Sequence, residues 1–131
     1  MAALSDDARE IFAKKAFVHV GTLMPDGSPQ VSPVWAELDG DRIVFNTAEG
    51  RVKPNNLRRD PRIALSVIDP DDDYHSVLIR GKVVEITEEG ADEHVNLMAK
   101  KYMGVDEYPF RQPDEVRLRV IVEPDREMVL P

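Results

Sequence analysis

Residues 17–47 read FVHVGTLMPDGSPQVSPVWAELDGDRIVFNT. Apolar residues recur here with a period close to 2, which is typical of strands, whereas the preceding residues follow the helical period of about 3.6. The Asp-Gly pairs at 26–27 and 39–40 tolerate the positive φ angles that tight hairpin turns need. The stretch therefore predicts an antiparallel meander of three strands. The predicted strands are residues 17–23, 30–38 and 42–47.

Three segments outside this meander have helical patterns. Residues 5–15 place apolar side chains on one stripe behind Ser5, a good N-cap. Residues 55–59 predict a second, short helix with Pro54 tolerated in its first turn. Residues 90–103 predict a third helix, which Gly104 ends.

The rest of the chain supplies further strands, predicted at residues 62–69, 74–87 and 116–122. Gly81 stands near the middle of the longest of them and indicates a bulge or a bend. Six strands with short turns and two or three short helices predict a mainly β (α+β) fold. We expect a small, six-stranded antiparallel barrel with the helices as plugs.

Composition limits the classes of function. The chain has 131 residues and is 42% hydrophobic, so residues 1–131 are expected to form one globular domain. With 25 acidic against 17 basic residues the net charge is −8, which argues against a general nucleic-acid binder. Because the chain contains no Cys, disulfides, thiolate nucleophiles and Cys-based zinc sites are excluded.

The sequence gives no indication of a membrane partner. The charged first 15 residues have no apolar signal-peptide core, and no apolar run approaches the roughly 20 residues that cross a bilayer. A cytoplasmic location is therefore expected. A chain this small also has little core to spare for a large ligand, which favours a cofactor site shared between two subunits.

Residues 51–62, RVKPNNLRRDPR, hold five of the 17 basic residues of this acidic chain. Arg51 and Lys53 precede or open the second predicted helix, whose first N–H groups have no partners inside the helix. Two cations beside such a helix start make a suitable phosphate site. The alternative is a solvated basic patch or a set of surface ion pairs.

No other constellation indicates catalysis by side chains. His19, His75 and His94 lack the spacing of metal ligands, so no metal site is expected. Trp35 either stacks on a bound ring system or fills the barrel wall. Since no nucleophile and no acid–base pair can be identified, the catalytic residues stay unknown, and the pattern suits an enzyme whose chemistry belongs to a cofactor.

The basic segment also carries a resemblance. Its pattern Arg-x-Lys-x-x-Asn-Leu-x-x-x-Pro-Arg, placed after a strand and before another, resembles the pyridoxamine-phosphate-oxidase-like, FMN-binding split β-barrel family. Within that family it is most similar to the small deazaflavin (coenzyme F420)-dependent reductases. Supporting motifs are Gly21-Thr22-Leu23, Pro29 to Trp35 and Arg80-Gly81, so the likeness covers about residues 17–87.

The resemblance implies a homodimer that holds its cofactor in a groove at the subunit interface. It implies that Arg51 and Lys53 bind the cofactor phosphate and that Asn56 of the same motif is also a cofactor-binding residue. The residues expected along the ring are Gln30, Ser32, Pro33 and Val34. Asn46 and Thr47 would reach the ring or the ribityl chain, and the partner subunit would contribute Tyr74 and Arg80.

The function so implied is transfer of a hydride between coenzyme F420 and an electron-poor substrate such as a quinone, an enone or a tetrapyrrole. The family's vitamin B6 oxidases end in an Arg-Leu-x-Pro signature, which residues 126–131, REMVLP, do not supply, so vitamin B6 oxidation is not expected. Two alternatives stay open. One is an FMN-binding oxidoreductase of the same fold, and the other is a non-catalytic protein that binds flavin, deazaflavin or haem.

Overall fold

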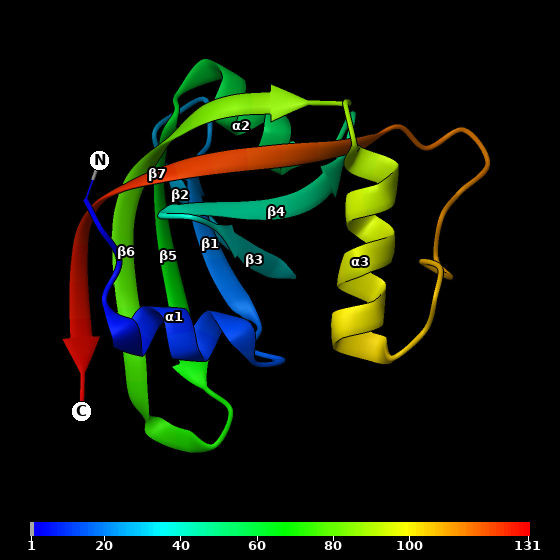
Figure 1. Cartoon of the computed structure of the whole chain (residues 1–131). Coiled ribbons are helices and arrows are strands. Elements are labelled where there is room, and N and C mark those ends of the chain that lie inside the picture. Colours follow the sequence, from blue (N-terminus) through cyan, green and yellow to red (C-terminus); the bar gives the residue numbers. More distant parts are fainter. Residues whose placement is uncertain (1) are drawn as a thin grey trace.

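The computed structural model describes residues 2–131, and strands dominate it (Figure 1). The strands are β1 (Val18–Leu23), β2 (Pro29–Val34), β3 (Ala36–Asp39), β4 (Arg42–Ala48), β5 (Arg62–Asp69), β6 (Asp72–Thr87) and β7 (Arg117–Leu130). The helices are α1 (Asp6–Ala13), α2 (Val52–Arg59) and α3 (Ala91–Met103). All strand pairs are antiparallel.

The seven strands found in residues 2–131 form one sheet in the order β2-β1-β5-β6-β7-β4-β3. The two edge strands, β2 and β3, are consecutive in the chain, and the sheet curls, which brings these two edges towards each other (Figure 1). The mainly β split-barrel prediction is therefore confirmed. The predicted count of six strands is wrong by one.

The additional strand arises at Trp35, which divides the strand predicted at residues 30–38. The residues before it pair with β1, and those after it pair with β4 on the opposite edge of the sheet. Val34 and Ala36 are both buried, so the apolar pattern continues through the corner. Hydrophobic periodicity therefore could not reveal that the chain changes partners here.

The last strand is longer than predicted, because β7 continues past residue 122 to Leu130. Pro124 lies opposite Gly81, where the pairing of β6 with β7 shifts register. A proline is tolerated at such an irregularity because the ladder there does not need its missing N–H. The bend predicted at Gly81 is confirmed at the same place.

The helix predictions from capping hold. Ser5 caps α1 by accepting the N–H of Ala8, and Gly104 ends α3 with a φ of 74°. The second helix begins earlier than predicted, at Val52, and Pro54 lies in its first turn.

Packing of the helices determines where a site can form. α2 contacts β1 and β4, α3 contacts β4 and β7, and α1 contacts β3 and β5. The core between them is apolar and includes Ile11, Val20, Phe45 and Ile79. Since both α2 and α3 contact β4, the end of that strand lies between two helices. Within residues 2–131, no helix combines the length and the apolar character that crossing a membrane requires.

We predict that Gly81→Ala strongly destabilises the fold. A Cβ at this position would lie 2.3 Å from the carbonyl oxygen of Glu123, so the backbone of β7 would have to move. The expected loss in free energy of unfolding is about 3 kcal/mol, measured by urea denaturation. Gly21→Ala is the matched control, because its nearest neighbour would be 3.7 Å away. Equal stability of the two variants would contradict the prediction.

Candidate functional site

A pocket of about 280 Å³ lies where β2 leaves the sheet and α2 begins. Its lining comes from the end of β2 and the corner after it, the end of β4 and the start of α2. One residue each of α3 and β7, Phe17 before β1, and two residues of the segment 104–116 complete it. Three cationic side chains line it, and we call it the cationic pocket. They are Arg51, Lys53 and Arg117.

Lys53 is the half-buried cation of this pocket. Its Nζ donates a hydrogen bond to Ser32 Oγ at 2.8 Å. Burial lowers the pKa of Lys53, and the nearby charge of Arg51 lowers it further. The ammonium is therefore less stable here than in water, and a bound anion would offset both effects.

The two arginines share one carboxylate. Glu115 pairs with Arg117, and its Oε1 lies 3.6 Å from Arg51 Nη2. Burial alone would raise the pKa of Glu115, but the Gln112 N–H and Arg117 outweigh it and hold that pKa below its usual value. Glu115 is thus an anion, and with Lys53 nearby the cationic pocket keeps a surplus of positive charge.

Two polar side chains of β4 complete the floor of the pocket. Thr47 is 1% exposed, and its Oγ1 has no hydrogen-bond partner among the described residues. The Asn46 amide, in contrast, uses both of its donors, towards Ala91 O and His94 Nδ1, and its oxygen accepts from Arg117 Nε. On the far side of the imidazole, His94 Nε2 approaches Glu37 Oε1 to 3.1 Å without the alignment of a hydrogen bond.

Aromatic rings form the remaining wall. Trp35 stacks on Tyr102 with ring centroids 5.3 Å apart and meets the edge of Tyr108 at 6.0 Å. Tyr108 in turn contacts Phe110, and its backbone N–H donates to Asn96 of α3 at 2.9 Å. Trp35 both lines the pocket and packs in the wall. Its position is therefore compatible with both roles considered from the sequence, stacking on a bound ring and filling the barrel wall.

The structure brings together many of the residues predicted to bind a cofactor. Those that line the cationic pocket are Pro33, Val34, Asn46, Thr47, Arg51 and Lys53. Ser32 joins them through its hydrogen bond to Lys53. Residues from three elements must lie close together if they are to bind one ligand, and this clustering meets that condition. Their role in binding stays a prediction.

Besides Ser32, four predicted residues lie outside the lining of this pocket. Asn56 is 2% exposed and donates to Thr22 Oγ1 at 3.0 Å while accepting from Arg59 Nη2 at 2.7 Å. Gln30 is exposed on the edge strand β2. Tyr74 is 87% exposed near the start of β6, and Arg80 lines a separate groove on the outer face of the sheet.

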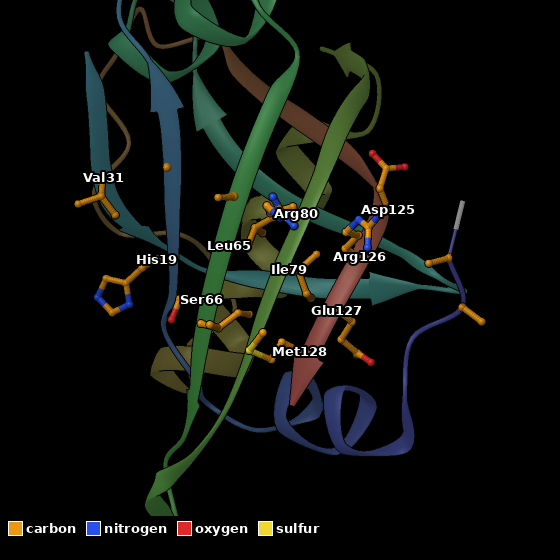
Figure 2. Close-up of a pocket in the computed structure, with 15 residues that line it drawn as sticks. His19, Val31, Leu65, Ser66, Ile79, Arg80, Asp125, Arg126, Glu127 and Met128 are labelled. Carbon is orange, nitrogen blue, oxygen red and sulfur yellow. The ribbon is translucent and has the colours of Figure 1, made fainter. Parts of the chain in front are cut away.

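Figure 2 shows that outer groove, which runs across β1, β5, β6 and β7 and has a volume of about 930 Å³. His19 and Val31 lie on one side of it, and Arg126 and Met128 lie on the other. His19 is therefore a pocket-edge residue rather than a core residue. Several large apolar side chains on this face are exposed. They are Val31 at 67%, Met128 at 58% and Leu78 at 38%.

Sequence reasoning did not find Arg117, Tyr108 and Phe110. Arg117 falls in the strand predicted at residues 116–122 without being assigned to a site, yet it is 4% exposed and lines the cationic pocket. The two aromatic residues lie in a segment without periodicity, where no local signal shows which way a side chain turns. In residues 2–131 no group of three or more His, Asp or Glu side chains is placed to hold a metal ion.

Comparison with known proteins identifies the family. A family model described as pyridoxamine 5'-phosphate oxidase matches residues 4–127. The chain belongs to the pyridoxamine 5'-phosphate oxidase family. The family resemblance inferred from the basic segment is thereby confirmed.

Solved structures agree with this family. The chain is similar to an F420 reductase, with a TM-score of 0.80 and 28% identity over 92% of this chain and 94% of the other. It is also similar to a conserved hypothetical protein from Mycobacterium tuberculosis, with a TM-score of 0.77 and 24% identity over 98% and 85% of the two chains. HupZ from Group A Streptococcus has a TM-score of 0.70 and 19% identity over 97% and 94%. The last two support the fold alone. The first is in line with the expected deazaflavin branch and with a flavin- or deazaflavin-related oxidoreductase fold.

We predict that Asn56→Ala lowers stability. The change removes the hydrogen bond to the buried Thr22 hydroxyl and leaves that group without its partner, at a cost of about 1–3 kcal/mol. Urea denaturation measures the loss, and Asn55→Ala, on the exposed side of α2, is the matched control. Unchanged stability together with weaker cofactor binding would instead show that Asn56 contacts the cofactor.

Proposed function

We propose that the protein is an oxidoreductase that binds coenzyme F420 and passes a hydride from it to an electron-poor substrate such as a quinone, an enone or a tetrapyrrole. The observation that carries the proposal is the cationic pocket, in which Arg51 and Lys53 lie beside the residues expected along the cofactor. The 28% identity to an F420 reductase favours the same cofactor. The proposed enzyme acts in the cytoplasm, with residues 1–131 as a single domain.

The residues present fit a phosphate-bearing cofactor. Thr47 Oγ1 is buried without a partner in the described residues, and a buried hydroxyl of this kind is costly unless something bonds to it. Burial lowers the pKa of Lys53, and the charge of Arg51 is close enough to lower it further, a repulsion that a bound phosphate would relieve. Both features suit an anionic ligand with hydrogen-bonding groups beside its charge.

When bound, the reduced deazaflavin supplies the hydride, and the chain's own residues position and shield it. Arg51 and Lys53 would hold the phosphate. Pro33 and Val34 would present an apolar surface to the ring, and the aromatic wall around Trp35 would exclude water. A proton for the substrate would come from solvent or from a pocket hydroxyl.

FMN is the second candidate cofactor, favoured by the family to which the chain belongs. Both cofactors carry a phosphate on a ribityl arm, so the cationic pocket suits either one. Titration of the purified protein with both, side by side, distinguishes them. Yellow protein with flavin absorption bands favours FMN. Colourless protein that changes deazaflavin fluorescence favours F420, and turnover of a quinone and enone panel then separates an enzyme from a non-catalytic binder.

The proposed site extends across two subunits. A pocket of about 280 Å³ lies just below the usual range of about 300–1,000 Å³ for ligand sites, so one chain offers little room to enclose a flavin-sized molecule. The outer groove presents exposed Val31, Leu78 and Met128, which a second copy of this chain would cover. Arg80 lies on that same face, where a partner subunit would meet it.

We predict that Lys53→Ala weakens binding of coenzyme F420 about ten- to a hundredfold. The change removes one charge-assisted contact to the phosphate, which is worth about 1.5–3 kcal/mol. Fluorescence titration measures the dissociation constant, and Lys82→Ala, an exposed lysine outside the pocket, is the control. An unchanged constant would place the phosphate elsewhere.

We predict that the protein is a dimer at micromolar concentration and that Leu78→Asp converts it to a monomer. A carboxylate in place of Leu78 would lose apolar contact area and would have to give up its hydration on association. Sedimentation velocity measures the state of both proteins. Leu97→Asp, at an exposed apolar position on α3 outside the outer groove, should leave the dimer intact. A monomeric wild-type protein would refute the shared site.

A further inference from the structure

Arg117 is a charged side chain held almost fully buried beside the cationic pocket. Its guanidinium is fixed on three sides. Nε donates to Asn46 Oδ1 at 2.8 Å, Nη1 pairs with Glu115, and Cζ lies 5.0 Å from the centroid of the Tyr108 ring. Burying such a charge is expensive unless it is paired and oriented. These contacts hold the fork in one position at the pocket wall.

The Asn46 amide has only one orientation that satisfies its neighbours. Nδ2 lies 3.0 Å from Ala91 O, an acceptor, so the nitrogen must point towards α3. The same Nδ2 lies 3.0 Å from His94 Nδ1, which then acts as an acceptor. Oδ1 is left facing the Nε–H of Arg117. Because both donors of Asn46 are directed at α3, this residue has no donor left for an anionic group and acts on a phosphate through Arg117.

Charge in the pocket is unbalanced. Glu115 pairs with Arg117 and also lies 3.6 Å from Arg51 Nη2, so one carboxylate serves two guanidinium groups. Lys53 lines the same pocket, and its recorded side-chain partner is the neutral hydroxyl of Ser32. A phosphate would complete the charge balance of these groups. The planar fork of an arginine matches phosphate oxygens better than a single ammonium does.

We propose that Arg117 is a third phosphate-binding cation, acting with Arg51 and Lys53, and that Asn46 is the positioning residue that holds its guanidinium in place. This inference rests on the proposed function. The ligand is a phosphate ester on a ribityl arm, and the phosphate of either F420 or FMN has that chemistry. Asn46 therefore has a different role from the direct cofactor contact implied by the family resemblance.

The first test removes Arg117 and its counter-ion together. The double variant R117M/E115Q deletes one positive and one negative charge, so the net charge of the protein is unchanged and no buried carboxylate loses its partner. Dissociation constants for F420 and for FMN are measured separately by fluorescence titration. We expect the constant of whichever cofactor binds the wild-type protein to rise about ten- to a hundredfold. Arg119→Met is the matched control, because Arg119 lies on the same strand and donates to Glu89 O outside the pocket.

The second test examines the role of Asn46. Asn46→Ala should weaken cofactor binding about tenfold in the wild-type background and leave it unchanged in R117M/E115Q, since a positioning residue has no effect once its target is gone. A merely structural contribution of Asn46 would lower affinity equally in both backgrounds. Equal losses would therefore overturn the positioning role.

Comparison with Lys53→Ala separates this inference from the proposed function. If Lys53→Ala loses affinity and R117M/E115Q does not, Arg117 is not a phosphate ligand, and the proposed function stands. If neither variant loses affinity, the cationic pocket is not the cofactor site, and both the role of Arg117 and the proposed function are wrong. Thermal unfolding checks that each variant is folded. Should R117M/E115Q not fold, Arg117→Lys replaces it, keeping the charge but losing the Nε bond to Asn46. Wild-type affinity in Arg117→Lys would overturn the positioning role of Asn46, because that role needs the Nε bond which lysine cannot make.

Discussion

A single buried carboxylate holds two arginines together at the pocket. Arg51 and Arg117 carry like charges, which repel each other. Glu115 pairs with Arg117 and also approaches Arg51, so its negative charge offsets that repulsion. Without it, two guanidinium groups and the ammonium of Lys53 would have to share a partly buried space with no counter-charge. The folded state therefore depends on Glu115 remaining ionised, which agrees with the lowered pKa of its carboxyl.

The positive pocket lies in a protein whose net charge is −8. Much of the other basic charge is used in surface pairs, for example Arg62 with Asp60 and Arg58 with Glu49. Exposed pairs of this kind contribute little to stability, but they neutralise basic side chains outside the cationic pocket, so the excess acidic charge is left on the surface around it. A small anionic ligand meets attraction at short range, and a long polyanion such as nucleic acid meets repulsion over the rest of the surface.

The sequence allowed the local features to be predicted where one residue type decides the backbone. Ser5 and Gly104 marked helix ends, and Gly81 marked the bend in β6, because each has a conformational or capping property that few residues share. Trp35 did not reveal the corner between β2 and β3, since the burial pattern is continuous there. Arg117 was missed for a related reason: alternation along a strand shows which side chains share a face, but the direction of that face depends on the partner strands.

The segment 104–116 connects α3 to β7 without taking part in the sheet, yet it supplies Tyr108, Phe110 and Glu115 to the site. The barrel can therefore keep its strands while this connection accumulates changes in length and composition. Except at Glu115, whose carboxylate neutralises the two arginines, selection can alter the shape and polarity of the pocket mouth here at little cost to folding. Divergence of ligand preference among proteins built on this barrel is accordingly easiest at this connection.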